Sequence, residues 1–246
     1  MRPIMVFGLF SKEKSLSKNI ERATNKLAQQ ADRWAALEKL KEDGTDAALV
    51  GLCRRWAITS TKATEDEQEK TWVVDALVAN GSGSLAPVRT YMKSAGSLSF
   101  PLRVLERVGS HDQVIEVVDE MFASEPPGYV RTPDRRIDLI RWFSEWKGAT
   151  DEEVVTRLTP YVTDYDENVR FATIEGIANR DPKLIAPPLI AGLLRPEEES
   201  GRIKRTIVEV LAKAKAPLGD EGPKVSAILT GPLGEFRVDA DVVRHR

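Results

Sequence analysis

Few side chains in this chain of 246 residues have the types and spacing that catalysis or metal binding requires. It has one cysteine, Cys53, and two histidines, His111 and His245, far apart in the sequence. A disulfide needs two cysteines, and a zinc site needs Cys or His ligands at short spacings. A Ser-His-Asp triad would have to use His111, which opens a predicted helix and has no Gly-x-Ser-x-Gly elbow to serve. Phosphate-binding loops of the Walker or Gly-x-Gly-x-x-Gly type are also absent, so we expect no catalytic residue, metal or cofactor.

The charges are nearly balanced, with 36 Lys and Arg residues against 38 Asp and Glu residues. Nucleic-acid binders normally carry a strong basic excess, so a protein or peptide partner is expected and a nucleic acid is not. No apolar run approaches the roughly 20 residues that span a membrane. The apolar start, residues 1–10, lacks the long core and cleavage site of a signal peptide, which predicts a cytoplasmic protein.

One eight-residue pattern recurs along the chain: a basic residue, two variable residues, two apolar residues, usually an acid, one variable residue and one apolar residue. The copies begin 31 to 37 residues apart, and this regular spacing is typical of helix-pair repeats. The third copy lacks the basic residue and the fourth lacks the acid. They lie at 33–40, 70–77, 101–108, 136–143, 170–177 and 204–211.

Helical segments with turn residues at their ends separate the copies, so each copy is expected in the second helix of a pair. The second helices are predicted near 31–43, 66–80, 99–108, 133–147, 166–178 and 200–214. An amphipathic helix over 15–30 would complete the first pair. The sequence therefore predicts an all-α protein: an α-solenoid of about six helix pairs over 15–230, between an apolar and charged arm, 1–14, and a non-helical tail, 231–246.

Two segments carry a family resemblance. Residues 166–177, Asp-Glu-Asn-Val-Arg followed by small and aliphatic residues, resemble the second helix of a HEAT repeat, and residues 181–194 resemble a first helix. The resemblance is strong over 150–214 and fair over 31–148. It implies a curved, right-handed stack of helix pairs that binds other molecules, but it names no activity.

The basic residue of each copy falls in the middle of the apolar face when successive residues turn by 100°. A buried charge without a partner is costly. We therefore expect these residues to bond acids and carbonyls in the turns, as the HEAT resemblance also implies. They are Arg33, Lys70, Arg136, Arg170 and Lys204.

The opposite face of the second helices is expected to line the concave surface of the stack. Its central column is mostly acidic: Glu38, Asp75, Glu106, Arg141, Glu175 and Glu209. This is either a solvated helix face or an acidic groove that attracts a basic segment. The middle of the face has the Trp and Arg residues that dominate many interfaces, although both indoles could instead pack on neighbouring helices. The candidate binding residues are Trp72, Arg103, Arg107, Asp138, Arg141 and Trp142.

The predicted function is that of a non-catalytic scaffold or adaptor that binds a protein partner. Two alternatives stay open. HEAT-like DNA glycosylases that remove alkylated bases use a Trp and an acid, which Trp142 and Glu145 would supply, but their grooves are basic. A HEAT-like bilin lyase, or an accessory factor for protein modification, is the second alternative.

Overall fold

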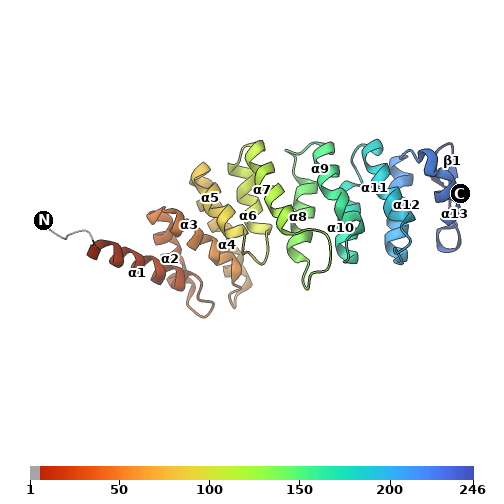
Figure 1. Cartoon of the computed structure of the whole chain (residues 1–246). Coiled ribbons are helices and arrows are strands. Elements are labelled where there is room, and N and C mark those ends of the chain that lie inside the picture. The colour runs from red at the N-terminus through yellow and green to blue at the C-terminus, as the bar shows by residue number, and fades with distance from the viewer. Residues whose placement is uncertain (1–5) are drawn as a thin grey trace. The chain divides into compact units, whose positions relative to one another are not determined.

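The computed structural model describes residues 6–246, and the first five residues of the predicted arm lie outside the described residues (Figure 1). Thirteen α-helices, several short 3-10 helices and one two-stranded sheet make up the described part, so the all-α prediction is confirmed. Contacts divide the chain into an N-terminal unit, which ends at Met121, and a C-terminal unit, Phe122–Arg246. The boundary falls within one helix, α7 (His111–Ser124).

The helices of the N-terminal unit form two rows. One row contains the second helices, with α2 packed on α4 and α4 on α6. In the other row, α1 packs on α3 and α3 on α5. The bounds are α1 Val6–Ala23, α2 Gln30–Asp43, α3 Asp46–Cys53, α4 Ala63–Ala79, α5 Leu85–Met92 and α6 Ser99–Val108.

The C-terminal unit repeats this arrangement. Its second helices pack in the order α8, α10 and α12, and its first helices in the order α9, α11 and α13. The bounds are α8 Asp134–Glu145, α9 Asp151–Leu158, α10 Glu167–Ile177, α11 Pro182–Leu194, α12 Gly201–Ala214 and α13 Gly222–Ile228. All six predicted second helices are thus present in the structure, in the predicted order, and their boundaries differ from the predicted ones by a few residues.

The predicted start of the first helix is wrong. Instead of covering 15–30, α1 begins at Val6 and ends at Ala23, so part of the predicted arm is helical. Thr24 Oγ1 donates to the Ile20 carbonyl at 2.8 Å, and Leu27 N donates to Asn25 Oδ1 at 2.9 Å. Such local side-chain bonds compete with helical ones, so the chain turns here and leads into α2.

The predicted tail folds back onto the C-terminal unit as a hairpin of β1 (Phe236–Asp239) and β2 (Val242–His245). The two turn residues, Ala240 and Asp241, have φ angles of 46° and 66°, as a tight hairpin turn needs. Phe236 is fully buried, β1 packs on α13, and β2 packs on α12. The hairpin therefore covers apolar surface at the end of the helix rows, as a terminal cap does in repeat proteins.

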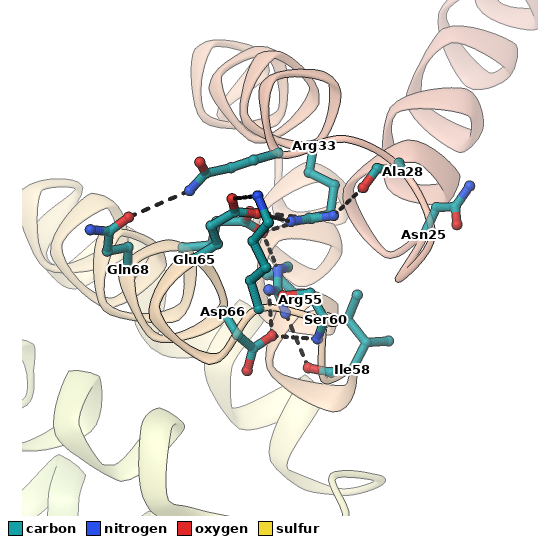
Figure 2. Close-up of polar contacts among 12 residues, drawn as sticks. Asn25, Ala28, Arg33, Arg55, Ile58, Ser60, Glu65, Asp66 and Gln68 are labelled. Carbon is teal, nitrogen blue, oxygen red and sulfur yellow. Dashed lines mark hydrogen bonds and ion pairs between the residues drawn. The ribbon is translucent and has the colours of Figure 1, made fainter.

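A buried cluster of charges in the N-terminal unit joins α2, α4 and the short 3-10 helix η1 (Arg54–Ala57) that follows α3 (Figure 2). Glu69 is fully buried and accepts hydrogen bonds from Arg33 Nη2 at 2.8 Å and from Arg55 Nε at 2.6 Å. Asp66 accepts from Arg55 Nη2 at 2.6 Å and pairs with Lys70 Nζ at 2.7 Å. Arg33 also donates to the carbonyl of Ala28 in the turn before α2.

Three carboxylates match the three buried cations of this cluster, because Glu65 lies 3.6 Å from Arg33; Glu65 also pairs with the exposed Lys62 at 2.8 Å. Desolvation of a guanidinium costs several kcal/mol, and only close, well-oriented partners offset that cost. The cluster therefore fixes the mutual position of α2, α4 and η1, because any shift would separate a buried charge from its partner.

The same arrangement of an acidic residue occurs twice in the C-terminal unit. In each case the acidic residue lies two positions before the N-cap residue of a second helix. Its carboxylate accepts a hydrogen bond from the N–H of that N-cap residue and pairs with the arginine of the preceding second helix. Asp164 accepts from Asp166 N at 2.8 Å and pairs with Arg136 at 2.7 Å. Glu198 does the same, as Ser200 N donates to it at 2.9 Å and Arg170 lies 2.8 Å away.

The turn carbonyls complete these pairs. Arg136 donates to the Gly128 carbonyl at 2.9 Å, and Arg170 donates to the Asp164 carbonyl at 2.9 Å. The predicted pairing with turn groups is thus confirmed for Arg33, Arg136 and Arg170, whereas Lys70 pairs with Asp66 one turn earlier on its own helix. Lys204, the last of the set, is only half-buried, and the chain after α12 continues into α13 and the hairpin rather than another second helix.

We predict that Glu69→Gln lowers the free energy of unfolding by about 3 kcal/mol or more, because it replaces the buried carboxylate that Arg33 and Arg55 share with a neutral amide. Urea denaturation followed by circular dichroism measures this effect. Glu67→Gln, an exposed position on the same helix, is the matched control and should change stability by less than about 0.5 kcal/mol. Equal denaturation midpoints for the two variants would contradict the role of the cluster.

Stability should also fall in acid because of Asp66. Burial disfavours its charged form, but bonds from Lys70, the Ser60 N–H and Arg55 outweigh burial and hold the pKa of this carboxyl well below its usual range. A lowered folded-state pKa contributes stability that is fully present above the unfolded pKa of about 4 and is lost as the pH falls toward the folded value. Urea denaturation from pH 7 to pH 3 should therefore show a shallower decline for Asp66→Asn than for the unmodified chain. Parallel declines would contradict the assignment.

Arg170→Ala should destabilise the chain by about 1–3 kcal/mol, because the buried Glu198 loses its charged partner and two turn carbonyls lose a donor. Arg141→Ala, an exposed arginine on the neighbouring second helix, provides the comparison. Thermal unfolding of both variants decides the point: an unchanged melting temperature for Arg170→Ala would remove its structural role.

Candidate functional site

The six candidate binding residues fall into two groups, one in each unit. Trp72 lies on α4, and Arg103 and Arg107 lie on α6. Asp138, Arg141 and Trp142 lie on α8 of the C-terminal unit. Each group is therefore described within its own unit.

In the N-terminal unit, a groove of about 750 Å³ lies between α2 and α4, and we call it the tryptophan groove. Trp34 of α2 and Trp72 of α4 meet there with ring centroids 5.5 Å apart and a 50° tilt. Both indoles are half-buried, so packing explains part of each ring and leaves the rest accessible. The groove is lined by Trp34, Ala63, Thr64, Glu67, Gln68, Thr71, Trp72 and Asp75.

Two carboxylates, Glu67 and Asp75, are the charged groups in this lining. Arg107 of α6 donates to Asp75 at 3.1 Å, and both side chains are about half exposed or more. Lys41 places its Nζ 5.5 Å from the centroid of the Trp72 ring, so a cation already sits on that indole face. Aromatic faces attract cations in this geometry, and nearby carboxylates add to the attraction. The groove can therefore hold an apolar side chain together with a Lys or Arg head group.

The other two candidates in this unit, Arg103 and Arg107, do not line the tryptophan groove. Arg103 lies over the ring of Phe100 on its own helix, with its guanidinium carbon 5.0 Å from the centroid. Arg107 reaches the groove only through Asp75.

The candidates of the C-terminal unit lie beside a different surface. Trp142 stacks on Trp146, with centroids 5.8 Å apart and an interplanar angle of 13°. It is half-buried, so here too packing accounts for much of the ring. Arg141 lines a polar cavity of about 470 Å³ between α8 and α10, together with Glu145 and Glu175. Asp138 is half-buried.

The predicted column on the outer side of the second helices is exposed at all six positions. It is acidic throughout the N-terminal unit, at Glu38, Asp75 and Glu106. In the C-terminal unit, Arg141 interrupts it before Glu175 and Glu209.

Sequence reasoning missed Trp34, which is half of the tryptophan groove. A signal was present: Trp34 occupies the second residue of the first copy and Trp72 the third residue of the next. Adjacent second helices bring such neighbouring register positions together. The pattern alone did not show which way the two rings would turn.

The cysteine and the two histidines lie on three separate elements, α3, α7 and β2. Cys53 is fully buried, and burial raises the pKa of its thiol to about 12, which keeps it protonated at neutral pH. His111 is exposed, with Nδ1 3.3 Å from Asp112. Within residues 6–246, no three His, Cys, Asp or Glu side chains are grouped so that they could hold a metal ion. Across the same residues, no helix combines the length and apolarity needed to cross a membrane.

Comparison with protein-family models, curated proteins and solved structures gave no match.

Proposed function

We propose that this chain is a non-catalytic, cytoplasmic scaffold built as a HEAT-like α-solenoid, and that the exposed face of its second helices binds a protein segment that carries basic residues. The sixfold sequence pattern, the two rows of helices in each unit and the repeated arginine–turn pairs support this reading. Ordered rows of this kind hold an extended surface in place, which suits recognition better than a reaction.

The observation that carries the proposal is the tryptophan groove. Trp34 and Trp72 offer rigid apolar area at a low entropic cost, and Trp is among the residues most enriched in binding hot spots. A partner's Arg or Lys would take the place of Lys41 on the Trp72 ring and gain the carboxylates of Glu67 and Asp75. This combination selects a basic and apolar peptide over a phosphate backbone.

Asp138, Arg141 and Trp142 form a second proposed contact region, confined to the C-terminal unit. Arg141, Glu145 and Glu175 give it both signs of charge within one polar cavity. Its part in binding would be to select polar residues of the partner, since the Trp142 ring is largely engaged by Trp146.

Selection from a random linear peptide library on the full chain tests the proposal. We expect one class of selected peptides to combine Lys or Arg with apolar residues. Trp72→Ala should weaken their binding by about 2 kcal/mol, the usual hot-spot threshold, while the circular dichroism spectrum stays unchanged. Tyr165→Ala removes an exposed aromatic ring elsewhere and should leave their affinity unchanged.

Charge is tested separately with Glu67→Lys, which should slow association of the basic peptides and reverse its dependence on salt. The proposal fails if the selected basic peptides bind the Trp34→Ala/Trp72→Ala double variant as tightly as the unmodified chain, or if no such class is selected.

A further inference from the structure

An apolar groove of about 690 Å³ lies between α11 and residues 217–224, which lead into α13, and we call it the proline groove. It belongs entirely to the C-terminal unit and shares no residue with the tryptophan groove or with the polar cavity between α8 and α10. Its volume is typical of sites that bind a ligand or a group of partner side chains. The apolar part of its lining includes Pro187, Ile190, Ala191, Leu194, Pro217 and Leu218.

The groove is open because the last first helix is short. α13 has 7 residues and α11 has 13, so α13 cannot cover its neighbour over the full length. The C-terminal hairpin packs on α12 and α13, and none of residues 236–245 lines the groove. The row of first helices therefore keeps an apolar surface open near its end, where repeat proteins normally carry a cap.

The walls of the groove are held in place. The N–H of Leu218 donates to the Asp241 carbonyl at 2.9 Å, which ties the turn before α13 to the hairpin. Pro187 and Pro217 each have a φ angle that is locked by the proline ring. A surface that is already ordered loses little entropy when a partner binds, so these walls favour binding.

The form of the groove favours a helical occupant. Its lining follows α11 from Lys183 to Leu194, which is roughly 17 Å at 1.5 Å per residue, or about three helical turns. No strand edge lines it, because α11 bonds its main chain internally and the Leu218 N–H is already used. An extended segment would find no ladder here, whereas a helix bonds its own main chain and needs only side-chain contacts.

The charges at the rim indicate which side chains that helix should carry. Two lysines, Lys183 and Lys224, and one carboxylate, Glu221, line the groove. Glu221 already pairs with Lys224 at 2.9 Å. Lys183 is exposed and forms no ion pair with any residue that the structure describes. The rim therefore has a surplus positive charge, which complements an acidic residue beside an apolar face.

We propose that the proline groove binds an amphipathic helix of a partner protein. Apolar residues at helical spacing would pack on Pro187, Ile190 and Ala191, and a carboxylate on the flank of the helix would pair with Lys183. This site is independent of the tryptophan groove, because the two occupants differ in charge and the two grooves lie in different units.

Selection from a library of peptides patterned as amphipathic helices, on the full chain, tests the proposal. The selected class should carry Asp or Glu beside its apolar face, and Ala191→Glu should weaken its binding at least about tenfold by placing a charge in the apolar lining. Ala227→Glu makes the same change at an exposed alanine of α13 outside the groove and should retain full affinity. The Trp34→Ala/Trp72→Ala variant should also retain it. Equal losses in the two alanine variants, or no acidic helical class, would overturn the proposal.

Charge reversal tests the role of Lys183, at an exposed position where the fold should tolerate it. Lys183→Glu should weaken binding severalfold, and changing one acidic residue of the peptide to Lys should restore affinity for this variant while weakening binding to the unmodified chain. Lys213→Glu on α12, outside the groove, is the control and should change nothing. If no peptide substitution restores binding to Lys183→Glu, the proposed ion pair is wrong.

The helical form of the occupant is tested with circular dichroism. A selected peptide, too short to be stably helical in water, should gain helical signal on binding, and a central proline should abolish its binding. Equal affinity of the proline peptide would overturn the helical form. Tighter binding of dodecanoate than of the peptides would show that the groove takes a small amphiphile instead, and dimerisation of the chain that Ala191→Glu abolishes would show that a second copy fills it.

Discussion

The pairing of buried arginines is the constraint on which the rest of this structure depends. Arg33, Arg55 and Arg136 are almost completely buried, and a guanidinium cannot lose its charge to escape the cost of burial. Each must therefore meet a carboxylate and carbonyls at short range. Since the carboxylates lie on the next second helix or in the turn before it, satisfying the arginine also fixes the position of one helix pair against another.

Periodicity predicted the arginines well but not all of their partners. The helical turn of 100° per residue placed Arg33, Arg136 and Arg170 on apolar faces, and burial then demanded partners. Arg55 belongs to no copy of the pattern, yet it bridges Glu69 and Asp66 at the centre of the cluster. Its role depends on how the chain turns after α3, which the spacing of apolar residues does not encode.

The candidate site was predictable to a similar degree. Register places Trp72 on the outer face of its helix, but the Trp34–Trp72 contact depends on the close approach of α2 to α4. The docking of the C-terminal hairpin was less predictable still. Partial alternation over 235–244 indicated a short strand, whereas the packing of β2 against α12 is a long-range contact that local pattern cannot supply.

The functional account follows from the same constraint. If buried ion pairs hold the second helices in place, the exposed faces of those helices are free to carry binding residues, as the tryptophan groove does. A double-mutant cycle between Arg136 and Asp164 tests the constraint most directly. We predict a coupling energy above about 1 kcal/mol in urea denaturation, because removing either side chain leaves the charge of the other buried without its partner. Additive single effects, with a coupling near zero, would contradict the account.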